Sequence, residues 1–244
     1  RAPGAGVALV SRILGLPPAN ITLHIIRSGG AFGRRADADF MVEAAAISQK
    51  AGVPVKLTWT RDQDLQHDHY RQAGHHFLKA GLDAAGGLIA WQNHFVTYGR
   101  RVPGRDGGTT LNTGSGGSLE AGQFPAGFVS NFETIQSVME CGIPVGPWRA
   151  PGNNGVAYVM QGFIDELAVA AGRDPLRFRL DLLNSAASGG DVGGRGPLNP
   201  SRARGVLQLA AEKAGWGRKF PRGQGAGIAF HYCFGGYIAY VAEV

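Results

Sequence analysis

A glycine-rich turn followed by two arginines is the first stretch of this chain that could do chemistry. Residues 28–35 read Ser-Gly-Gly-Ala-Phe-Gly-Arg-Arg and follow the apolar run Ile21–Ile26. Glycine permits positive φ angles and close backbone approach, so the turn can present N–H groups to an anion beside fixed positive charge. No Gly-Lys-Ser/Thr and no G-x-G-x-x-G spacing is present, which excludes the common nucleotide-binding loops. The alternative is a flexible connection with two solvated arginines.

A second stretch, residues 146–154, reads Gly-Pro-Trp-Arg-Ala-Pro-Gly-Asn-Asn. The planar guanidinium of Arg149 suits contacts to an anionic ligand. A buried arginine that ties the loop to helix carbonyls is the alternative interpretation of the same residue.

Four histidines and an aspartate crowd into a short segment, His67-Asp68-His69 and His75-His76. If 67–69 is a strand, His67 and His69 share one face and could bind zinc or copper together with His75, in a metal-binding module that is not an enzyme. Asp68 would point to the opposite face. Solvated or hydrogen-bonded histidines are the alternative, and a scaffold without activity is a third interpretation of the chain.

Composition favours a globular chain that binds a discrete anion. The 244 residues are 44% apolar, and 24 Lys and Arg exceed 18 Asp and Glu, giving a net charge of +6. The arginines recur near glycine turns rather than in a run, which argues against nucleic acid as a partner. Cys141 and Cys233 have no zinc spacing and are expected to be buried thiols. No apolar run is long enough for a transmembrane segment, and no leader pattern opens the chain.

Hydrophobic periodicity and turn residues predict an α+β fold, with mixed sheets and packed helices. Helices are expected at 7–14, 40–51, about 155–171, from Asp174-Pro175 onward, and 204–214. Strands are expected at 21–26, 53–59, 77–82, 88–98, 134–141 and, as a pair, within 225–244. No structure is predicted for the loop 100–127. The glycine-rich segment 185–200 is expected to link a first domain, 1–184, to a second that begins at 201–244.

Four motifs, in this order, resemble the molybdopterin-binding subunit of the xanthine dehydrogenase and aldehyde oxidase family. They are Gly-Gly-Ala-Phe-Gly-Arg-Arg at 29–35, Trp-Arg-Ala-Pro-Gly at 148–152, Gly-Phe-Ile-Asp-Glu-Leu-Ala at 162–168 and Asp-Pro-Leu-Arg-Phe-Arg at 174–179. The likeness covers nearly the whole chain and is closest to the isoquinoline 1-oxidoreductase beta-subunit type. It implies the fold of the molybdenum-cofactor-binding domains of that family.

The resemblance implies a fragment of a hydroxylase subunit that oxidises an aldehyde or N-heterocycle with water as the oxygen source. The implied cofactor is molybdopterin with molybdenum, in its cytosine dinucleotide form, and the protein supplies no metal ligand of its own. Gly30, Phe32, Gly33 and Arg149 occupy the family's cofactor-binding positions, and Phe32 also walls the substrate funnel. Electrons would pass to a small iron–sulfur subunit, since this chain lacks the cysteines for two-iron, two-sulfur clusters.

For Arg71 the resemblance implies a charged contact with the substrate. This residue lies ten residues after Arg61, as an arginine does in xanthine-oxidising relatives, where it stabilises charge developing on the bound heterocycle or carbonyl. The alternative is a surface salt bridge, for example to Asp68, worth only about 0 to 1 kcal/mol.

The chain also departs from the family pattern. Ala36 stands where several members carry a glutamate that binds purine-like substrates, so xanthine is not the expected substrate. The family's catalytic base, a glutamate, and its oxo-contacting glutamine have no counterpart here, so we assign no base. Both ends look cut, and the chain alone is expected to be inactive. The resemblance leaves cytoplasm and periplasm equally open.

Overall fold

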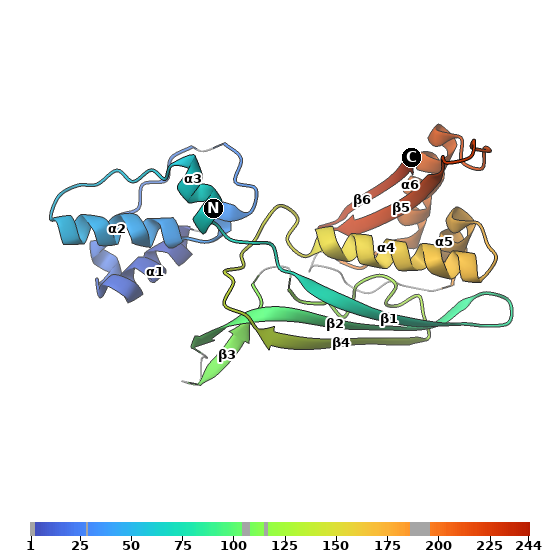
Figure 1. The fold of residues 1–244 in the computed structure, drawn as a ribbon, viewed down its shortest axis with the longest axis horizontal. Helices are drawn as coiled ribbons and strands as arrows, with labels where there is room; N and C mark the ends of the chain where they lie inside the picture. Colours follow the sequence, from blue (N-terminus) through green and yellow to red (C-terminus); the bar gives the residue numbers. More distant parts are fainter. Residues whose placement is uncertain (1–2, 28, 104–107, 115–116, 186–195) are drawn as a thin grey trace. The chain divides into compact units, whose positions relative to one another are not determined.

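The computed structural model describes residues 3–27, 29–103, 108–114, 117–185 and 196–244, and it confirms the α+β class (Figure 1). The described residues fall into two compact units. Unit 1 takes its residues from 1–73, 98–116 and 140–151, and unit 2 takes its residues from 74–97, 117–139 and 152–244.

The described part of unit 1 contains three α-helices. Helix α1, Pro3–Leu14, packs on α2, Asp39–Ala51. Gly6 lies at this contact, where a Cβ would be 2.8 Å from Cε at the end of the Met41 side chain. Helix α2 ends at Gly52, whose φ of 68° is the left-handed C-cap that glycine favours.

Helix α3, Arg61–His67, was not predicted, although a sequence signal for it exists. Thr60 accepts a hydrogen bond from the N–H of Gln63, and the Gln63 side chain accepts one from the N–H of Thr60. This reciprocal capping box satisfies two N–H groups that would otherwise lack partners at the helix start. The pattern Thr-x-x-Gln at 60–63 could therefore have located the helix.

Two expected strands are wrong. Residues 21–26 and 53–59 form no strand, although burial still alternates along 53–59, where Val55, Leu57 and Trp59 are partly covered. A strand needs a hydrogen-bonding neighbour, and no described segment pairs with either stretch. Ile25 and Ile26 are consequently 77% and 82% exposed.

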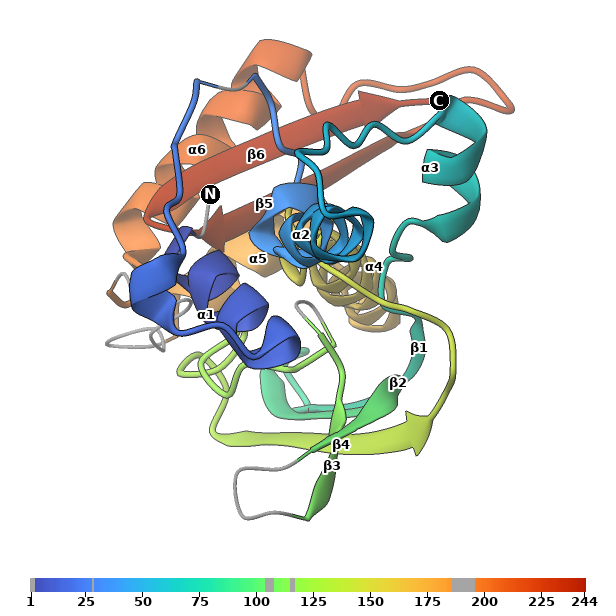
Figure 2. The same ribbon diagram turned by 90° about the vertical axis from the view of Figure 1, so that its left-hand side faces the viewer.

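Unit 2 holds the main hydrophobic core. Strands β1, Gly74–Leu82, and β2, Leu88–Pro103, form the expected hairpin, and β4, Asn131–Glu140, pairs with β2. Strands β5, Ala226–Cys233, and β6, Gly236–Glu243, form a second antiparallel ribbon. The helices α4, Asn153–Ala170, α5, Pro175–Asn184, and α6, Pro200–Ala214, pack with these strands; Figure 2 shows α6 beside the β5–β6 ribbon.

The core joins residues from every layer of unit 2. Its fully buried members include Trp91 on β2, Ile164 on α4, Leu183 on α5, Leu207 on α6 and Ile228 on β5. The ring of Trp91 meets that of Phe163 edge to face at 5.0 Å. Burial of such side chains, each contributing about 1.5 to 3 kcal/mol, is what holds the two sheets to the helices.

The region 100–127 is more ordered than the sequence predicted. Strand β2 continues to Pro103, and β3, Thr109–Asn112, pairs with it from Arg100 to Pro103. The two β-branched residues Thr109 and Thr110 are the only local signal for β3. Residues 104–107 and 115–116 of this loop lie outside the described part.

Residues 201–244 pack within unit 2, where α6 lies against α5, β5 and β6. Residues 186–195, most of the predicted linker, are not among those described. Whether 1–184 and 201–244 are separate domains therefore stays a prediction.

Candidate functional site

The glycine turn, residues 29–35, has the unusual backbone that its composition predicts. Phe32 and Gly33 have φ angles of 47° and 95°, and the short 3₁₀ helix Arg34–Ala36 follows at once. The ring of Phe32 folds back over Gly30, where a Cβ would lie 2.7 Å from it. Phe32 itself is 66% exposed, so its ring is available to another molecule.

Gly33 brings the glycine turn against the arginine turn, residues 146–151. A Cβ on Gly33 would lie 2.6 Å from the carbonyl oxygen of Pro147 and 2.7 Å from Cα of Trp148. Only glycine permits this backbone contact at a φ of 95°. The two motifs, more than a hundred residues apart in the chain, thus meet inside unit 1. The side chain of Arg149, beside this contact, is exposed.

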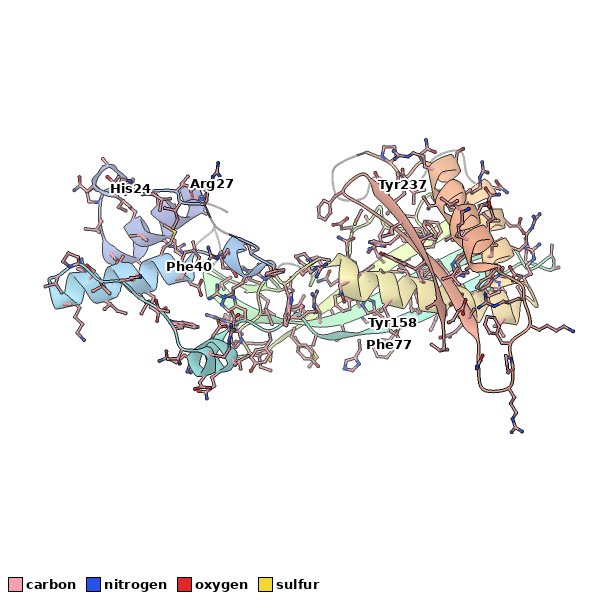
Figure 3. The ribbon with its side chains drawn as sticks, turned by 90° about the horizontal axis from the view of Figure 1, so that it is seen from above. His24, Arg27, Phe40, Phe77, Tyr158 and Tyr237 are labelled. Carbon is pink, nitrogen blue, oxygen red and sulfur yellow. The ribbon has the colours of Figure 1, made fainter. Side chains whose placement is uncertain are left out.

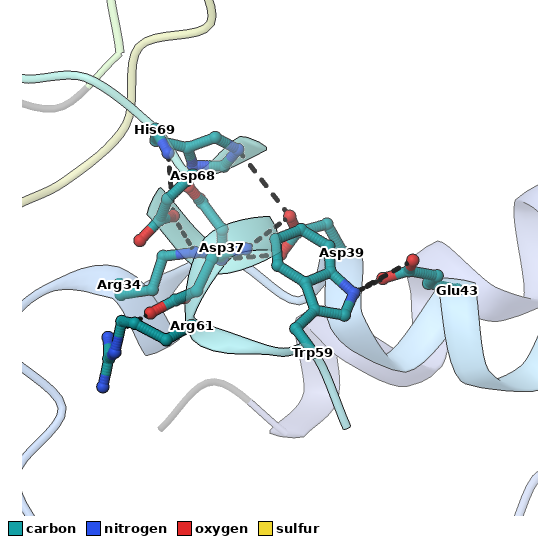
Figure 4. Close-up of polar contacts among 9 residues, drawn as sticks. Arg34, Asp37, Asp39, Glu43, Trp59, Arg61, Asp68 and His69 are labelled. Carbon is teal, nitrogen blue, oxygen red and sulfur yellow. Dashed lines mark hydrogen bonds and ion pairs between the residues drawn. The ribbon is translucent and has the colours of Figure 1, made fainter. Parts of the chain in front are cut away.

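A polar network connects the glycine turn to the segment after α3 (Figure 4). Arg34 donates to both carboxylate oxygens of Asp39, at 2.8 and 2.9 Å, and also contacts Asp68. His69 lies 3.1 Å from a carboxylate oxygen of Asp37 and 3.7 Å from one of Asp39. Planar guanidinium and carboxylate groups match each other in such two-point contacts, so the network orients 34–39 relative to 68–69.

These contacts also shift the pKa values of Arg34 and Asp39. The hydrogen bonds to Asp39 raise the pKa of Arg34 against a smaller opposing effect of burial. For Asp39, burial raises the pKa, but hydrogen bonds and charge attraction from Arg34 together outweigh it and the pKa falls below its ordinary value. Asp39 therefore carries its negative charge in the folded state at neutral pH.

Arg71 hydrogen-bonds to the backbone of the arginine turn. The alternative interpretation of this residue was a surface salt bridge to Asp68. Its guanidinium donates to the carbonyl oxygens of Arg149 at 2.7 Å, Pro151 at 2.9 Å and Ala150 at 3.5 Å. Its Cζ also lies 5.8 Å from the centre of the Trp148 ring. The alternative for Arg149 was a buried arginine that ties the loop to helix carbonyls, but its side chain is exposed. It is Arg71 that donates to carbonyls of the loop, and the sequence offered no sign of this role.

Arg71 also lines a cavity of about 650 Å³ within unit 1. The other walls are mostly apolar: Tyr70, Ala73, Tyr98, Gly99, Cys141, Gly142, Ile143, Pro144 and Val145. This volume lies in the range of small-molecule sites, which combine an apolar lining with few polar groups. Cys141 is only partly covered, and so is Cys233, so the expectation of buried thiols is wrong for both.

The histidine cluster does not form the metal site weighed above. His67 ends helix α3 and faces Trp59, whereas His69 belongs to the extended segment after it and contacts Asp37 and Asp39. His76 stacks on Phe95 at 4.1 Å, and burial lowers its pKa although a hydrogen bond with Asn93 opposes the shift. Within the described ranges, no group of three or more His, Cys, Asp or Glu could hold a metal ion.

The donor set at the two turns fits an anionic organic cofactor. Gly29 and Gly30 are exposed, nothing lies within 4 Å of a Cβ position on Gly29, and the side chains of Arg35 and Arg149, on the same two turns, are exposed. Exposed backbone next to guanidinium groups can bind phosphate or a pterin ring. A metal held by such a cofactor needs no cluster of protein ligands. Fold and site together define a cofactor-binding α+β protein.

Comparison with known proteins identifies the family. Residues 2–183 match the model of the molybdopterin cofactor-binding domain, and the chain belongs to this family. The resemblance drawn from the motifs is thereby confirmed.

Two curated relatives match most of the chain. It is 26% identical over 246 residues to isoquinoline 1-oxidoreductase subunit beta of Brevundimonas diminuta, covering 95% of this chain and 28% of the relative. It is 27% identical over 238 residues to a membrane-bound aldehyde dehydrogenase (pyrroloquinoline-quinone) of Gluconacetobacter polyoxogenes, covering 90% of this chain and 30% of the relative. The chain thus spans less than a third of the length of these proteins.

Solved structures share the fold. Aldehyde oxidoreductase from Desulfovibrio gigas superposes with a TM-score of 0.67 at 20% identity, over 92% of this chain and 25% of that one. Quinoline 2-oxidoreductase from Pseudomonas putida 86 gives a TM-score of 0.63 at 16% identity, over 93% of this chain and 30% of that one. None of the described helices has the length and apolar character needed to span a membrane.

Proposed function

We propose that this chain is part of the large subunit of a molybdenum hydroxylase that oxidises an aldehyde or N-heterocycle, with water as the oxygen source. The observation that carries the proposal is the backbone contact between Gly33 and Pro147-Trp148, which joins two motifs of a molybdopterin-binding family at one place. The relatives whose names identify them as subunits support a multi-subunit enzyme, and the proposed partner is a small iron–sulfur subunit that accepts the electrons.

Each site residue has a proposed role in holding the cofactor, molybdopterin in its cytosine dinucleotide form. Gly30 leaves its backbone exposed, Gly33 joins the glycine turn to the arginine turn, Phe32 offers an exposed aromatic wall, and the exposed guanidinium of Arg149 pairs with anionic groups. When bound, the molybdenum cofactor would supply the oxidising centre that accepts electrons from the substrate. The chain's own contribution is to bind, to orient and to exclude water.

For Arg71 we propose a role in orienting the substrate. Its place in the wall of an otherwise mostly apolar cavity supports this role, because one cation in such a lining can stabilise negative charge on a flat heterocycle or carbonyl. Ala36 ends the 3₁₀ helix after the glycine turn and offers no polar contact, which fits a substrate less polar than a purine.

The function is tested by expressing the full-length subunit together with the iron–sulfur subunit and measuring molybdenum, pterin and turnover. We expect bound molybdenum with pterin and hydroxylation of an aldehyde or N-heterocycle that takes its oxygen from ¹⁸O-labelled water. Zinc or copper instead of molybdenum would support the metal-binding alternative, and no metal at all would support a scaffold. Either outcome overturns the proposal.

A further inference from the structure

We propose that His69 and Arg71 are positioning residues that set the conformation of the arginine turn before any cofactor binds. The proposed function does not assign this role to either side chain. Only its final readout, molybdenum content, rests on that function.

The first contact is made by the backbone between the two residues. The N–H of Tyr70 donates to the carbonyl of Pro144 at 2.9 Å, and the N–H of Gly146 donates to the carbonyl of Tyr70 at 3.1 Å. Tyr70 and Val145 thereby form a parallel bridge. This pairing places the side chains of residues 69 and 71 at the start and at the end of the arginine turn.

Arg71 acts at the end of the turn. The carbonyls of three successive residues, 149–151, converge on its guanidinium. Ala150, the middle residue, has a φ of 52°, a left-handed conformation that is disfavoured for any residue with a Cβ. Hydrogen bonds from a planar, permanently charged donor offset that cost. Because the bonds go to carbonyls, they hold the backbone and leave the Arg149 side chain exposed.

His69 acts at the start of the turn. A Cβ on Gly146 would collide with the imidazole of His69, whose own Cβ lies 2.8 Å from that position, so the ring packs directly on the backbone of Gly146. Asp37, 3.1 Å from the ring, belongs to the segment just after the glycine turn. The arginine turn is therefore held at residues 146, 147–148 and 149–151 by His69, Gly33 and Arg71 respectively.

This arrangement predicts a preorganised turn. If a binding loop already has its bound conformation, no ordering cost is subtracted from the binding free energy. Removing Arg71 should loosen the turn even in a protein that contains no cofactor, which separates this role from contact with substrate.

Trypsin cleavage after Arg149 measures the loosening directly, in the full-length subunit prepared without cofactor. The variants are Arg71→Met, Arg71→Lys and the control Arg101→Met, which removes an arginine that pairs with Glu140 elsewhere in unit 1. We expect trypsin to cleave Arg71→Met at least tenfold faster than wild type. The cleavage rate of Arg71→Lys should lie between those two, and the rate of Arg101→Met should equal that of wild type. Equal rates for Arg71→Met and Arg101→Met would overturn the proposal.

A second variant covers the case in which Arg71→Met does not fold. Gly146→Ala places a methyl group against His69, and we expect faster cleavage after Arg149 together with faster exchange of the Tyr70 amide hydrogen. An unchanged cleavage rate in both Gly146→Ala and Arg71→Lys would equally overturn the proposal.

In the full-length enzyme, Arg71→Met should lower bound molybdenum at least threefold, and Arg71→Lys should restore part of it. Turnover per bound molybdenum then reports only the substrate role. If wild type binds no molybdenum, the proposed function fails, whereas the cleavage rates still decide the positioning role. If molybdenum binds equally to all variants and cleavage is unchanged, the positioning role fails and the proposed function stands.

Discussion

Gly33 shows how one residue type can decide the geometry of a site. A side chain at this position would meet the backbone of Pro147 and Trp148, which cannot move aside as a flexible side chain could. The residue also has a φ of 95°, far from the values that other residues adopt. Both constraints favour glycine at this one position.

Gly33→Ala should therefore separate the turns. We expect a loss of about 2 to 4 kcal/mol in the free energy of unfolding, from the disfavoured φ and from overpacking. The control is Gly29→Ala, since a Cβ at Gly29 meets nothing within 4 Å. Denaturant unfolding measures both, and equal stability of the two variants would show that the contact between the turns is not needed.

The ion pair of Arg34 and Asp39 gives a pH-dependent contribution to stability. The pKa of Asp39 is lower in the folded protein than its ordinary value, because Arg34 outweighs the effect of burial. The contribution is thus fully present above the unfolded-state pKa of about 4 and is lost as the pH falls through the folded-state pKa.

Asp39→Asn should reduce the loss of stability between pH 7 and pH 3. Arg34→Met should have the same effect plus the loss of the Arg34 contact with Asp68, and the double variant should add little to Arg34→Met, because both changes remove the Arg34–Asp39 pair. Urea midpoints at a series of pH values provide the measurement. Additive effects of the two substitutions would mean that the pair contributes no coupling energy.

At the scale of elements, α5 carries a buried charge that organises unit 2. Arg179 is fully buried, donates to Gln161 and Asp165 on α4 and to the carbonyl of Pro175, and burial lowers its pKa although Asp165 opposes the shift. Gln161 also accepts the N–H of Phe230 on β5 at 3.3 Å. The guanidinium therefore ties α4 and α5 together beside the β5–β6 ribbon.

Arg179→Met should destabilise the protein by roughly 1.5 to 3 kcal/mol or more, because hydrogen bonds to a charged donor are lost and their partners remain in place. Arg177→Met, on the exposed side of the same helix, removes only an ion pair with Asp181 and should cost about 0 to 1 kcal/mol. Thermal unfolding of the two variants tests the difference. Similar losses of stability in the two variants would show that the buried contacts of Arg179 contribute no more than an exposed ion pair.

The sequence predicted helix α5 correctly, whereas it gave no sign that 21–26 and 53–59 would form no strand. Asp174 accepts the N–H of Arg177 at 2.9 Å and Pro175 begins the helix, as the local sequence indicated. A helix satisfies its hydrogen bonds within one segment, but a strand depends on a partner elsewhere. His24, in the first stretch, and Phe40, at the start of α2, line one cavity of unit 1 (Figure 3) instead of a sheet core.

In the whole molecule, the chain covers less than a third of the length of each of the two curated relatives. A hydroxylase needs a bound cofactor, a catalytic base and an acceptor for the electrons taken from the substrate. The chain offers candidate residues for the first requirement only. Activity therefore belongs to a larger assembly under the proposed function.

The 244 residues by themselves should not oxidise any aldehyde or N-heterocycle with an artificial electron acceptor. The full-length subunit with its iron–sulfur partner is the positive control for the assay. Turnover by the isolated chain after reconstitution with cofactor would show that the base and the electron outlet are contained within it.

The sequence alone determined the class of the protein, because glycine turns, caps and hydrophobic periodicity are local and act within a few residues. It predicted α1, α2, α4, α5 and α6 within a few residues at each end, but not α3. It also pointed to Gly30, Phe32, Gly33 and Arg149 as residues of one site, whose cofactor roles stay a proposal. Tertiary structure decided which residues hold that site together. The contacts of Arg71 with three carbonyls, of His69 with Gly146 and of Gly33 with Pro147 join positions far apart in the chain. Sequence spacing carries no information on such contacts, because they depend on how segments approach in space and not on the residues beside them.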